Sequence, residues 1–221
     1  MRLRSASPAI TAAVTALLLA TPPASAHAGS AAQRLYREDT CFGKAPTQPL
    51  GLPGETVYGT AGDDVILGGG RVEAGAGDDL VCDADYVLAG PGDDRVRMLD
   101  GGTAFGNGGS DEFVSIVVSE TAVGPTLIGG AGNDIFWGSQ LGEIIYGGGG
   151  MDVARPGGGN DVVDLGGGDD QGYGGPGDDR FDGGKGDDYL DGGTGDDDVD
   201  GGRGKDRCLA VESRTSCRPT D

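Results

Sequence analysis

Nine nonapeptides follow one another without a gap over residues 129–209, and this period constrains the fold more than any other feature of the chain. Each nonapeptide carries an acidic residue at its sixth position and, in most copies, an apolar residue at its eighth. The sixth-position residues are Asp134, Glu143, Asp152, Asp161, Asp170, Asp179, Asp188, Asp197 and Asp206. The eighth-position residues are Phe136, Ile145, Ala154, Val163, Gly172, Phe181, Leu190, Val199 and Cys208. A charge and an apolar side chain thus recur in fixed phase, which predicts a stacked repeat architecture.

Within one nonapeptide, the first five positions are mostly Gly with Asp or Asn, as in tight turns that need positive φ. Positions seven to nine are often β-branched or aromatic, which is typical of a short strand. Because alternate side chains of a strand point to opposite faces, the eighth position is expected to face inward and the seventh and ninth outward. Gly172 is the exception at the eighth position and predicts a weak rung.

Residues 59–128 carry the motif in a looser form. Asp64, Asp79 and Asp94 are spaced by fifteen residues, and Asp111 follows. Fifteen residues are too few for a full turn of two nonapeptides, so irregular early repeats are expected here. Residues 115–128 alternate apolar and polar side chains without an acidic loop, which predicts a strand without metal ligands.

The chain is strongly acidic, with a formal net charge of −20. It contains 47 Gly among 221 residues and only 5% aromatic residues, so a compact core of large side chains is not expected. The charge argues against binding to nucleic acid or to an anionic membrane. Stacked turns would place equivalent carboxylates about 4.8 Å apart, where they repel by roughly 1 kcal/mol even in bulk water. A hard divalent cation would remove this repulsion, and oxygen ligands on flexible loops favour Ca²⁺.

Three segments, residues 129–137, 183–191 and 192–200, resemble the G-G-x-G-x-D-x-U-x repeats of hemolysin-type calcium-binding (RTX) proteins. The resemblance implies an all-β fold, a right-handed parallel β-roll (a β-solenoid) in which two nonapeptides make one turn. It also implies that Ca²⁺ lies between loops two repeats apart on the same side. Asp152, Asp170, Asp188 and Asp206 then share one side and Asp161, Asp179 and Asp197 the other, while Asp134 and Glu143 are left without an assigned side. The metal ligands predicted in this way are Asp64, Asp79, Asp94, Asp111, Asp134, Asp152, Asp161, Asp170, Asp179, Asp188, Asp197 and Asp206.

Three repeats depart from the RTX pattern. Glu143 replaces Asp in a repeat that has Leu141 at a glycine position, which puts that site in doubt. Pro156 and Leu165 replace the first Gly of their repeats.

The first 26 residues have the features of a secretory signal peptide. Arg2 and Arg4 precede the apolar residues 9–20, and residues 24–26 form an A-x-A cleavage motif. The apolar stretch is too short to span a bilayer, so a secreted, extracellular protein is expected. The predicted organisation is a signal peptide (1–26), a short N-terminal segment (27–58), irregular early repeats (59–128), the regular β-roll (129–209) and a C-terminal cap or tail (210–221).

Four cysteines in an exported chain suggest disulfides. Cys208 and Cys217 would close a short loop at the end of the array, and Cys41 and Cys82 would tie the N-terminal segment to the early repeats. Other pairings are compatible with the sequence. A zinc site of all four cysteines is disfavoured because no C-x-x-C pair exists.

The leading functional hypothesis is a secreted, non-enzymatic protein that folds on binding Ca²⁺. The alternative is an extracellular adhesion or matrix module, in which the outward aromatic residues Trp137, Tyr146, Tyr173 and Tyr189 bind an unknown surface partner. A hydrolase with a calcium-dependent domain lacks a place for catalytic residues. A G-x-G-x-x-G match at residues 172–177 lies inside the repeats with no helix pattern after it, so a dinucleotide site is not expected.

Overall fold

The computed structural model describes residues 40–119, 122–210, 213–215 and 217–218, which belong to one compact unit, Glu38–Asp221. The predicted signal peptide and residues 27–39 lie outside this range. Twenty strands and no helix occur in the described residues. In this part of the chain, therefore, no helix has the length and apolar character that a membrane span requires.

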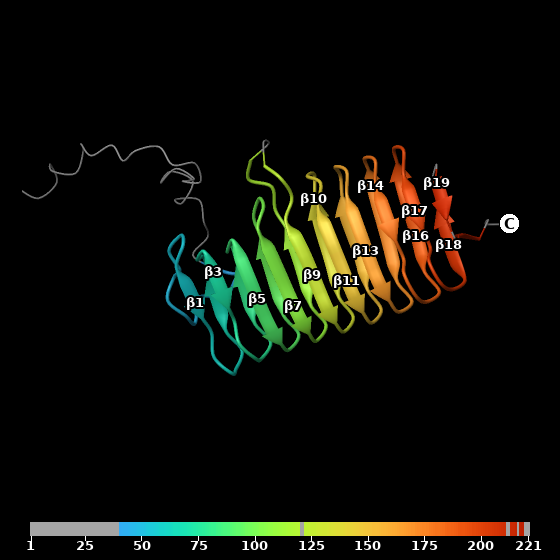
Figure 1. The fold of residues 1–221 in the computed structure, drawn as a ribbon. Coiled ribbons are helices and arrows are strands. Elements are labelled where there is room, and N and C mark those ends of the chain that lie inside the picture. Colours follow the sequence, from blue (N-terminus) through green and yellow to red (C-terminus); the bar gives the residue numbers. More distant parts are fainter. Residues whose placement is uncertain (1–39, 120–121, 211–212, 216, 219–221) are drawn as a thin grey trace, which may run out of the picture. The chain divides into compact units, whose positions relative to one another are not determined.

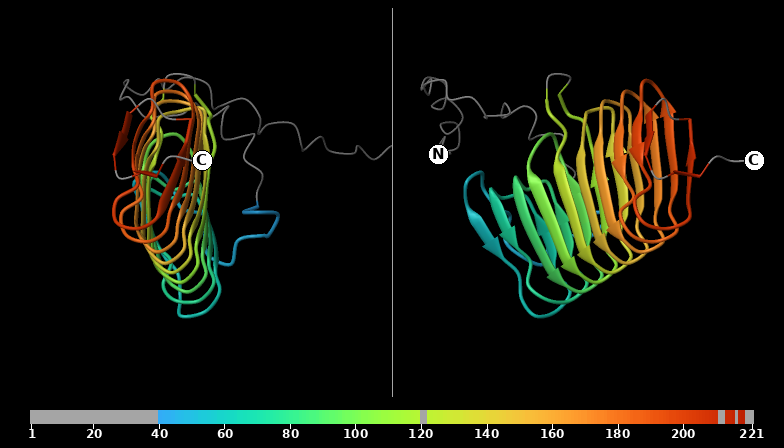
Figure 2. Two further views of the ribbon diagram at one scale, coloured as in Figure 1. Left: turned by 90° about the vertical axis from the view of Figure 1, so that its right-hand side faces the viewer. Right: turned by 45° about the vertical axis from the view of Figure 1, so that its right-hand side comes forward.

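The strands form two parallel ten-stranded sheets, and consecutive strands alternate between them (Figure 1). The two sheets form opposite walls of a flattened coil (Figure 2). We call them the odd sheet and the even sheet after their strand numbers. The odd sheet contains β1 (Thr56–Tyr58), β3 (Arg71–Glu73), β5 (Tyr86–Pro91), β7 (Thr103–Gly108), β9 (Thr126–Ala131), β11 (Ile144–Gly149), β13 (Val162–Gly167), β15 (Arg180–Asp182), β17 (Asp198–Asp200) and β19 (Ser213–Thr215).

The even sheet lies opposite and has the same strand-by-strand order. It contains β2 (Val65–Leu67), β4 (Leu80–Cys82), β6 (Arg95–Met98), β8 (Glu112–Ser115), β10 (Ile135–Ser139), β12 (Val153–Gly157), β14 (Gln171–Pro176), β16 (Tyr189–Thr194), β18 (Asp206–Leu209) and β20 (Cys217–Arg218). The predicted all-β, parallel solenoid fold is confirmed.

The register shows how many residues make one turn. In the regular array Ile135 pairs with Val153, so a turn takes 18 residues, which is two nonapeptides. Upstream, Val65 pairs with Leu80, and a turn takes only 15 residues. Fifteen residues are fewer than two nonapeptides, yet here they complete one turn of the coil. The connection without a column acid is short here, since only residues 68–70 join β2 to β3, and so the shorter coil still closes.

The prediction of a strand over residues 115–128 was wrong in its middle. Ser115 ends β8 and Thr126 begins β9, and the described residues between them belong to no strand. Because Thr126 pairs with Thr103 in the odd sheet, the extra residues leave the coil as a loop. Two main-chain amides hold this loop. The Val118 N–H donates to a carboxylate oxygen of Asp100, and the Gly101 N–H donates to the Val123 carbonyl oxygen, each over 2.8 Å.

The core is one continuous cluster of inward side chains, which come from both sheets. The eighth-position residues of all nine nonapeptides are buried, including three phenylalanine and isoleucine side chains that are 0–2% exposed: Phe136, Ile145 and Phe181. The predicted inward orientation of this position is confirmed. The rung at Gly172 is filled by its neighbour, because a Cβ at Gly172 would lie 2.6 Å from the ring of Phe181.

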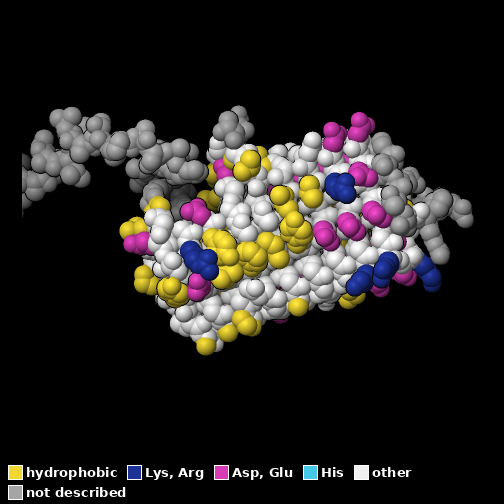
Figure 3. All heavy atoms as spheres, viewed as in Figure 1, with side chains coloured by type: hydrophobic (Ala, Val, Ile, Leu, Met, Phe, Trp, Pro, Cys, Tyr) yellow, Lys and Arg dark blue, Asp and Glu magenta, His cyan; other side chains and the backbone are white. Residues whose placement is uncertain are grey.

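The outer faces of the two sheets differ in side-chain type. Over the middle of the odd sheet, hydrophobic side chains gather in a continuous patch, with acidic side chains beyond it towards the C-terminal end (Figure 3). On the even sheet, the Arg155 guanidinium lies 5.1 Å from the ring centroid of Trp137 and 4.6 Å from that of Tyr173. Tyr189 continues this row, but Tyr146 lies on β11 of the odd sheet. The four aromatic residues named for the adhesion alternative therefore do not share one face.

Two disulfides reinforce the ends of the coil. Cys41–Cys82 anchors the N-terminal segment over the even sheet, where Cys41, Val65 and Leu67 form a second small apolar cluster. Cys208–Cys217 joins β18 to the last strand, β20. Both ends of the stack are thus covalently tied to a neighbouring segment.

Candidate metal centre

The sixth-position acids precede the strands in two columns, one on each edge of the coil. We call the first the long column, because it continues through the fifteen-residue turns. In it the amide N–H of each Asp donates to Oδ1 of the Asp one turn later, over 2.7–3.1 Å. Its members are Asp64, Asp79, Asp94, Asp111, Asp134, Asp152, Asp170, Asp188 and Asp206.

The short column lies before the odd-sheet strands and contains Glu143, Asp161, Asp179 and Asp197. The same amide-to-Oδ1 hydrogen bonds join them over 2.7–2.9 Å. The structure thus assigns Asp134 to the long column and Glu143 to the short one. It also places the four early aspartates in line with the regular array, which the fifteen-residue spacing had obscured.

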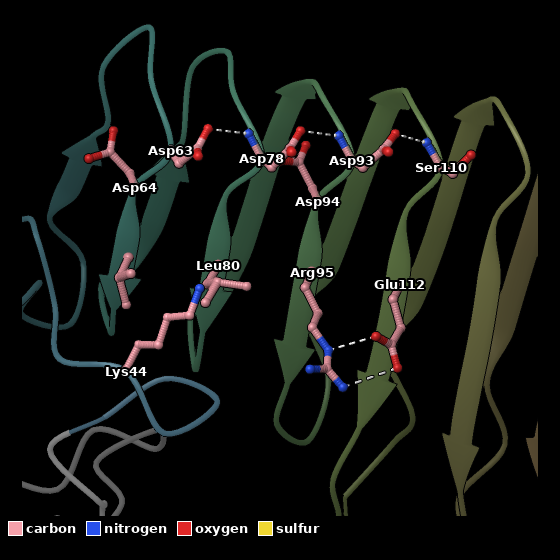
Figure 4. A pocket seen from close by; sticks show the side chains of 11 residues that line it. Lys44, Asp63, Asp64, Asp78, Leu80, Asp93, Asp94, Arg95, Ser110 and Glu112 are labelled. Carbon is pink, nitrogen blue, oxygen red and sulfur yellow. Dashed lines mark hydrogen bonds and ion pairs between the residues drawn. The ribbon is translucent and has the colours of Figure 1, made fainter.

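A second, exposed ladder stabilises the same loops through the fifth position. Here the hydrogen bonds run in the opposite direction along the stack. The amide of Asp78 donates to Oδ1 of Asp63, and that of Asp93 donates to Oδ1 of Asp78, over 3.0 and 2.9 Å. Figure 4 shows these three residues and Ser110 in one row beside a groove of about 460 Å³. Sequence reasoning missed this role, although the recurrent Asp or Asn before the sixth-position acid was a visible signal.

The second oxygen of most column carboxylates has no hydrogen-bond donor. Among the described residues these oxygens are buried and unpartnered, although a buried carboxylate oxygen ordinarily has a donor or a cation. The acids concerned are Asp79, Asp94, Asp111, Asp134, Glu143, Asp152, Asp161, Asp170, Asp179, Asp188 and Asp206.

The first glycine of the nonapeptide makes room around this unpartnered oxygen. A Cβ built at Gly129 would lie 2.1 Å from Oδ2 of Asp134 and 2.7 Å from the carbonyl oxygen of Gly147, one turn on. At Gly183 the corresponding distances are 2.6 Å to Asp188 Oδ2 and 2.8 Å to the Gly201 carbonyl oxygen. Two acceptor oxygens from consecutive turns therefore approach one small space, which suits a cation.

Four repeats lack this glycine. Ala74, Ala89, Pro156 and Leu165 take its place before Asp79, Asp94, Asp161 and Asp170, and all four side chains are buried. Pro156 and Leu165 therefore take up the space that the first glycine leaves beside the acid of the same repeat, Asp161 and Asp170 respectively. The glycine-lined carboxylates, such as Asp134, Asp152 and Asp188, have the better fit to a cation.

Burial raises the pKa of several column aspartates above the usual value of 3.8, among them Asp94, Asp134, Asp161 and Asp170. The pKa of Asp134 and that of Asp170 rise to about 7, and neighbouring carboxylates of the column add to the effect of burial. The pKa rises to about 8 for Asp94 and Asp161, two of the acids without the glycine. Without a cation, ionisation of these groups above about pH 7 lowers the stability of the fold.

These shifts predict a pH dependence for the calcium-free protein. A carboxyl whose pKa is higher in the folded than in the unfolded state stabilises the fold fully below about pH 3.8. That contribution declines as the pH rises and is lost above the folded pKa, here about 6 to 8. The calcium-free chain should therefore have a larger free energy of unfolding at pH 5 than at pH 8, measured by denaturant titration with far-ultraviolet circular dichroism. Equal stability at both pH values would contradict the assignment of raised pKa values.

Asp64 and Glu143 differ from the other column acids. Oδ1 of Asp64 accepts from Thr47 and Gln48, over 2.9 and 2.7 Å, and Oδ2 accepts from the Thr60 amide over 2.6 Å. Although burial acts to raise it, these hydrogen bonds leave the pKa of Asp64 below its usual value. Asp64 thus needs no cation, and it caps the column. Thr47 and Gln48 lie outside the repeats and could not have been found from them.

Glu143 begins the short column and has partners of its own. Its Oε1 accepts hydrogen bonds from the hydroxyls of Ser115, at 3.1 Å, and Ser139, while Oε2 is one of the unpartnered oxygens. Burial raises the pKa of Glu143, and the two hydroxyls act against this rise. The longer side chain is thus accommodated by two serines that the repeat pattern does not contain.

The donor set matches a hard cation held largely by the main chain. In the described residues, no three side chains of His, Cys, Asp or Glu converge on one point. A cation between two turns would therefore take one or two carboxylates and complete its shell with carbonyl oxygens of the glycine loops. Carboxylate and carbonyl oxygens in a pliable loop are the ligands that Ca²⁺ prefers.

Comparison with known families supports the same chemistry. The RTX calcium-binding nonapeptide repeat matches in four copies, over residues 54–70, 126–140, 137–172 and 173–208. Comparisons with curated proteins and with solved structures gave no significant match. The chain thus carries RTX calcium-binding nonapeptide repeats in the coils that build its two sheets.

Proposed function

We propose that this chain is an exported, non-enzymatic calcium-binding protein whose folding depends on the ion. The observation that carries the proposal is the row of buried, unpartnered carboxylate oxygens, five of which lie beside a carbonyl oxygen of the next turn, those of Asp111, Asp134, Asp152, Asp179 and Asp188. We assign the strongest ligands to the glycine-lined members Asp111, Asp134, Asp152, Asp179, Asp188 and Asp206. Asp79, Asp94, Asp161 and Asp170 are assigned as weaker ligands.

Coupling to folding follows from how each site is assembled. A carboxylate and the carbonyl oxygen beside it come from different turns, so neither loop forms the site alone. When a site does not exist in the unfolded chain, the free energy of binding contributes to the free energy of folding. Extracellular calcium modules bind at about 10⁻⁴–10⁻³ M, and we expect that range here.

The ligand assignment is tested by Asp188→Asn. The amide oxygen of Asn can still accept the Asp170 N–H, which Asp188 Oδ1 accepts over 2.9 Å, but the charge beside the Gly201 carbonyl oxygen is lost. We expect the calcium concentration at half-saturation to rise about tenfold, measured by isothermal titration calorimetry together with circular dichroism. A tenfold change corresponds to about 1.4 kcal/mol, within the range of one charge-assisted contact.

Asp191→Asn is the matched control, because Asp191 belongs to the same repeat but points outward from β16. It should leave the calcium midpoint unchanged. If Asp188→Asn and Asp191→Asn shift the midpoint equally, the effect is one of net charge, and the ligand assignment is wrong.

A further inference from the structure

The outer face of the odd sheet carries two straight columns of side chains, at the seventh and ninth repeat positions. Parallel pairing in register brings Leu88, Phe105, Ile128 and Tyr146 into one ninth-position column. Ile144 and Val162 are neighbours in the seventh-position column, and Tyr86 begins its apolar part. Ile144, Tyr146 and Val162 are 40–44% exposed. We call this surface the odd-face patch. Contiguous apolar surfaces of this kind commonly mark interaction sites.

Each end of the odd-face patch carries a pair of opposite charges on one strand. On β3, Arg71 occupies the seventh position and Glu73 the ninth, and their side chains form an ion pair at 2.8 Å. On β15, Arg180 occupies the seventh position and Asp182 the ninth. The order along the strand is therefore the same at both ends, positive first and negative second.

We propose that the odd-face patch binds a second copy of this chain, related by a twofold axis parallel to the stacking direction. Such a rotation sets every strand against its own copy, running antiparallel, so the seventh position faces the ninth. Arg71 then faces Glu73 of the second copy, and Arg180 faces Asp182 of the second copy. Between these charged ends, Ile144 faces Tyr146 and Tyr86 faces Leu88. Thr103 and Thr126 face Phe105 and Ile128, and Val162 faces Asp164, a carboxylate that lies within the contact.

The charges exclude the other face-to-face twofold arrangement. With the axis along the strands and through β9, the stacks run in opposite directions and the seventh position faces the seventh. Arg71 would then face Arg180, and Glu73 would face Asp182, so both ends would repel. Self-complementary surfaces of this type form closed dimers rather than filaments.

The extent of the patch defines a modest interface. From β3 to β15 there are six strand spacings of about 4.8 Å, or about 29 Å. With a width of about 15 Å, the two copies would bury on the order of 900 Å², the size of a weak and reversible contact. The contact ends before β17, where the rotation would set Asp198 against Asp200.

The surface is tested by two matched substitutions in calcium-saturated protein. Tyr146→Glu and Trp137→Glu alter aromatic residues of similar exposure, 44% and 41%, on opposite sheets. We expect Tyr146→Glu to raise the dimer dissociation constant at least tenfold and Trp137→Glu to leave it unchanged, by sedimentation velocity over a concentration series. Circular dichroism with calcium checks that both variants fold. A wild-type chain that stays monomeric at 500 μM, or a dimer lost only in Trp137→Glu, overturns the proposal.

The orientation is tested by exchanging the charges of one rung. Arg180→Asp alone should weaken the dimer, because two carboxylates would then face each other across the axis. Arg180→Asp combined with Asp182→Arg should restore it, since opposite charges again meet. The ion pair of Arg180 with Asp198 on the neighbouring strand, at 2.9 Å, is lost in both variants and so does not account for a restoration. If the double variant dimerises as weakly as Arg180→Asp alone, the arrangement with the axis parallel to the stacking direction is overturned.

Discussion

Removal of Ca²⁺ with a chelator at pH 7.5 is expected to unfold the coil from end to end. The long and short columns place buried carboxylates one strand spacing apart, in a chain whose net charge is −20. Without a cation, each column must either take up protons or separate its turns. The radius of gyration of residues 27–221 should rise from about 16 Å, the value for a compact chain of this length, to as much as roughly 47 Å, with loss of the strand signal.

Small-angle X-ray scattering and circular dichroism of one sample, with and without chelator, measure both effects. The disulfides Cys41–Cys82 and Cys208–Cys217 keep the unfolded chain somewhat more compact than this limit. Excess Ca²⁺ should restore the folded state, whereas Mg²⁺ at the same concentration should restore it poorly, because it requires stricter octahedral geometry. A strand-rich, compact protein that ignores the chelator would show that the carboxylates are satisfied in another way.

Gly129→Ala is expected to have the next largest effect. The added Cβ would lie 2.1 Å from Oδ2 of Asp134 and 2.7 Å from the Gly147 carbonyl oxygen, so it occupies the space proposed for the cation. Overpacking of this severity costs about 3 kcal/mol of unfolding free energy, before the loss of a calcium site is added. Calcium-saturated denaturant titration gives the stability, and calorimetry should show one site fewer.

Gly149→Ala separates this effect from the general cost of replacing a glycine. Neither Gly129 nor Gly149 has a positive φ, and a Cβ at Gly149 finds its nearest atom at 3.9 Å. Its effect should stay within about 0.5 kcal/mol, because nothing is displaced. Equal destabilisation by the two substitutions would refute the steric and ionic role of Gly129.

The sequence predicts this fold well wherever one physical rule repeats in phase. The alternation that buries Phe136 and Ile145 and exposes Ile135 and Trp137 follows from strand geometry alone. The resemblance to RTX repeats implies two nonapeptides per turn, which places Asp152 in line with Asp170. These features needed no knowledge of side-chain packing.

Features that depend on contacts between different turns could not be predicted. The fifteen-residue turns close because their three-residue strands still pair in register, as Val65 does with Leu80. Phe181 fills the space at Gly172 from the opposite sheet, and sequence neighbours do not reveal this. Ser115 reaches Glu143 from another turn, 28 residues away in sequence, so no local motif records its role.

The placement of the aromatic residues shows a further limit of the repeat pattern. Trp137 and Tyr146 both occupy the ninth position of adjacent nonapeptides. Adjacent nonapeptides contribute to opposite sheets, so these two rings point away from each other. The position within a nonapeptide determines whether a side chain points into the core or outward. The place of the nonapeptide in the series determines on which of the two sheets that side chain lies.

The two hydrogen-bond ladders along the loops run in opposite directions, from turn to next turn at the sixth position and back at the fifth. Every turn is therefore bonded to its immediate neighbours in the same way, and to nothing farther along the stack. Length is consequently an adjustable property of this architecture. Removal of one complete 18-residue coil would shorten the stack by one spacing of about 4.8 Å and leave the remaining coils in register. The number of coils thus sets both the reach of the molecule and its capacity for ions, and either can change by whole units without a new fold.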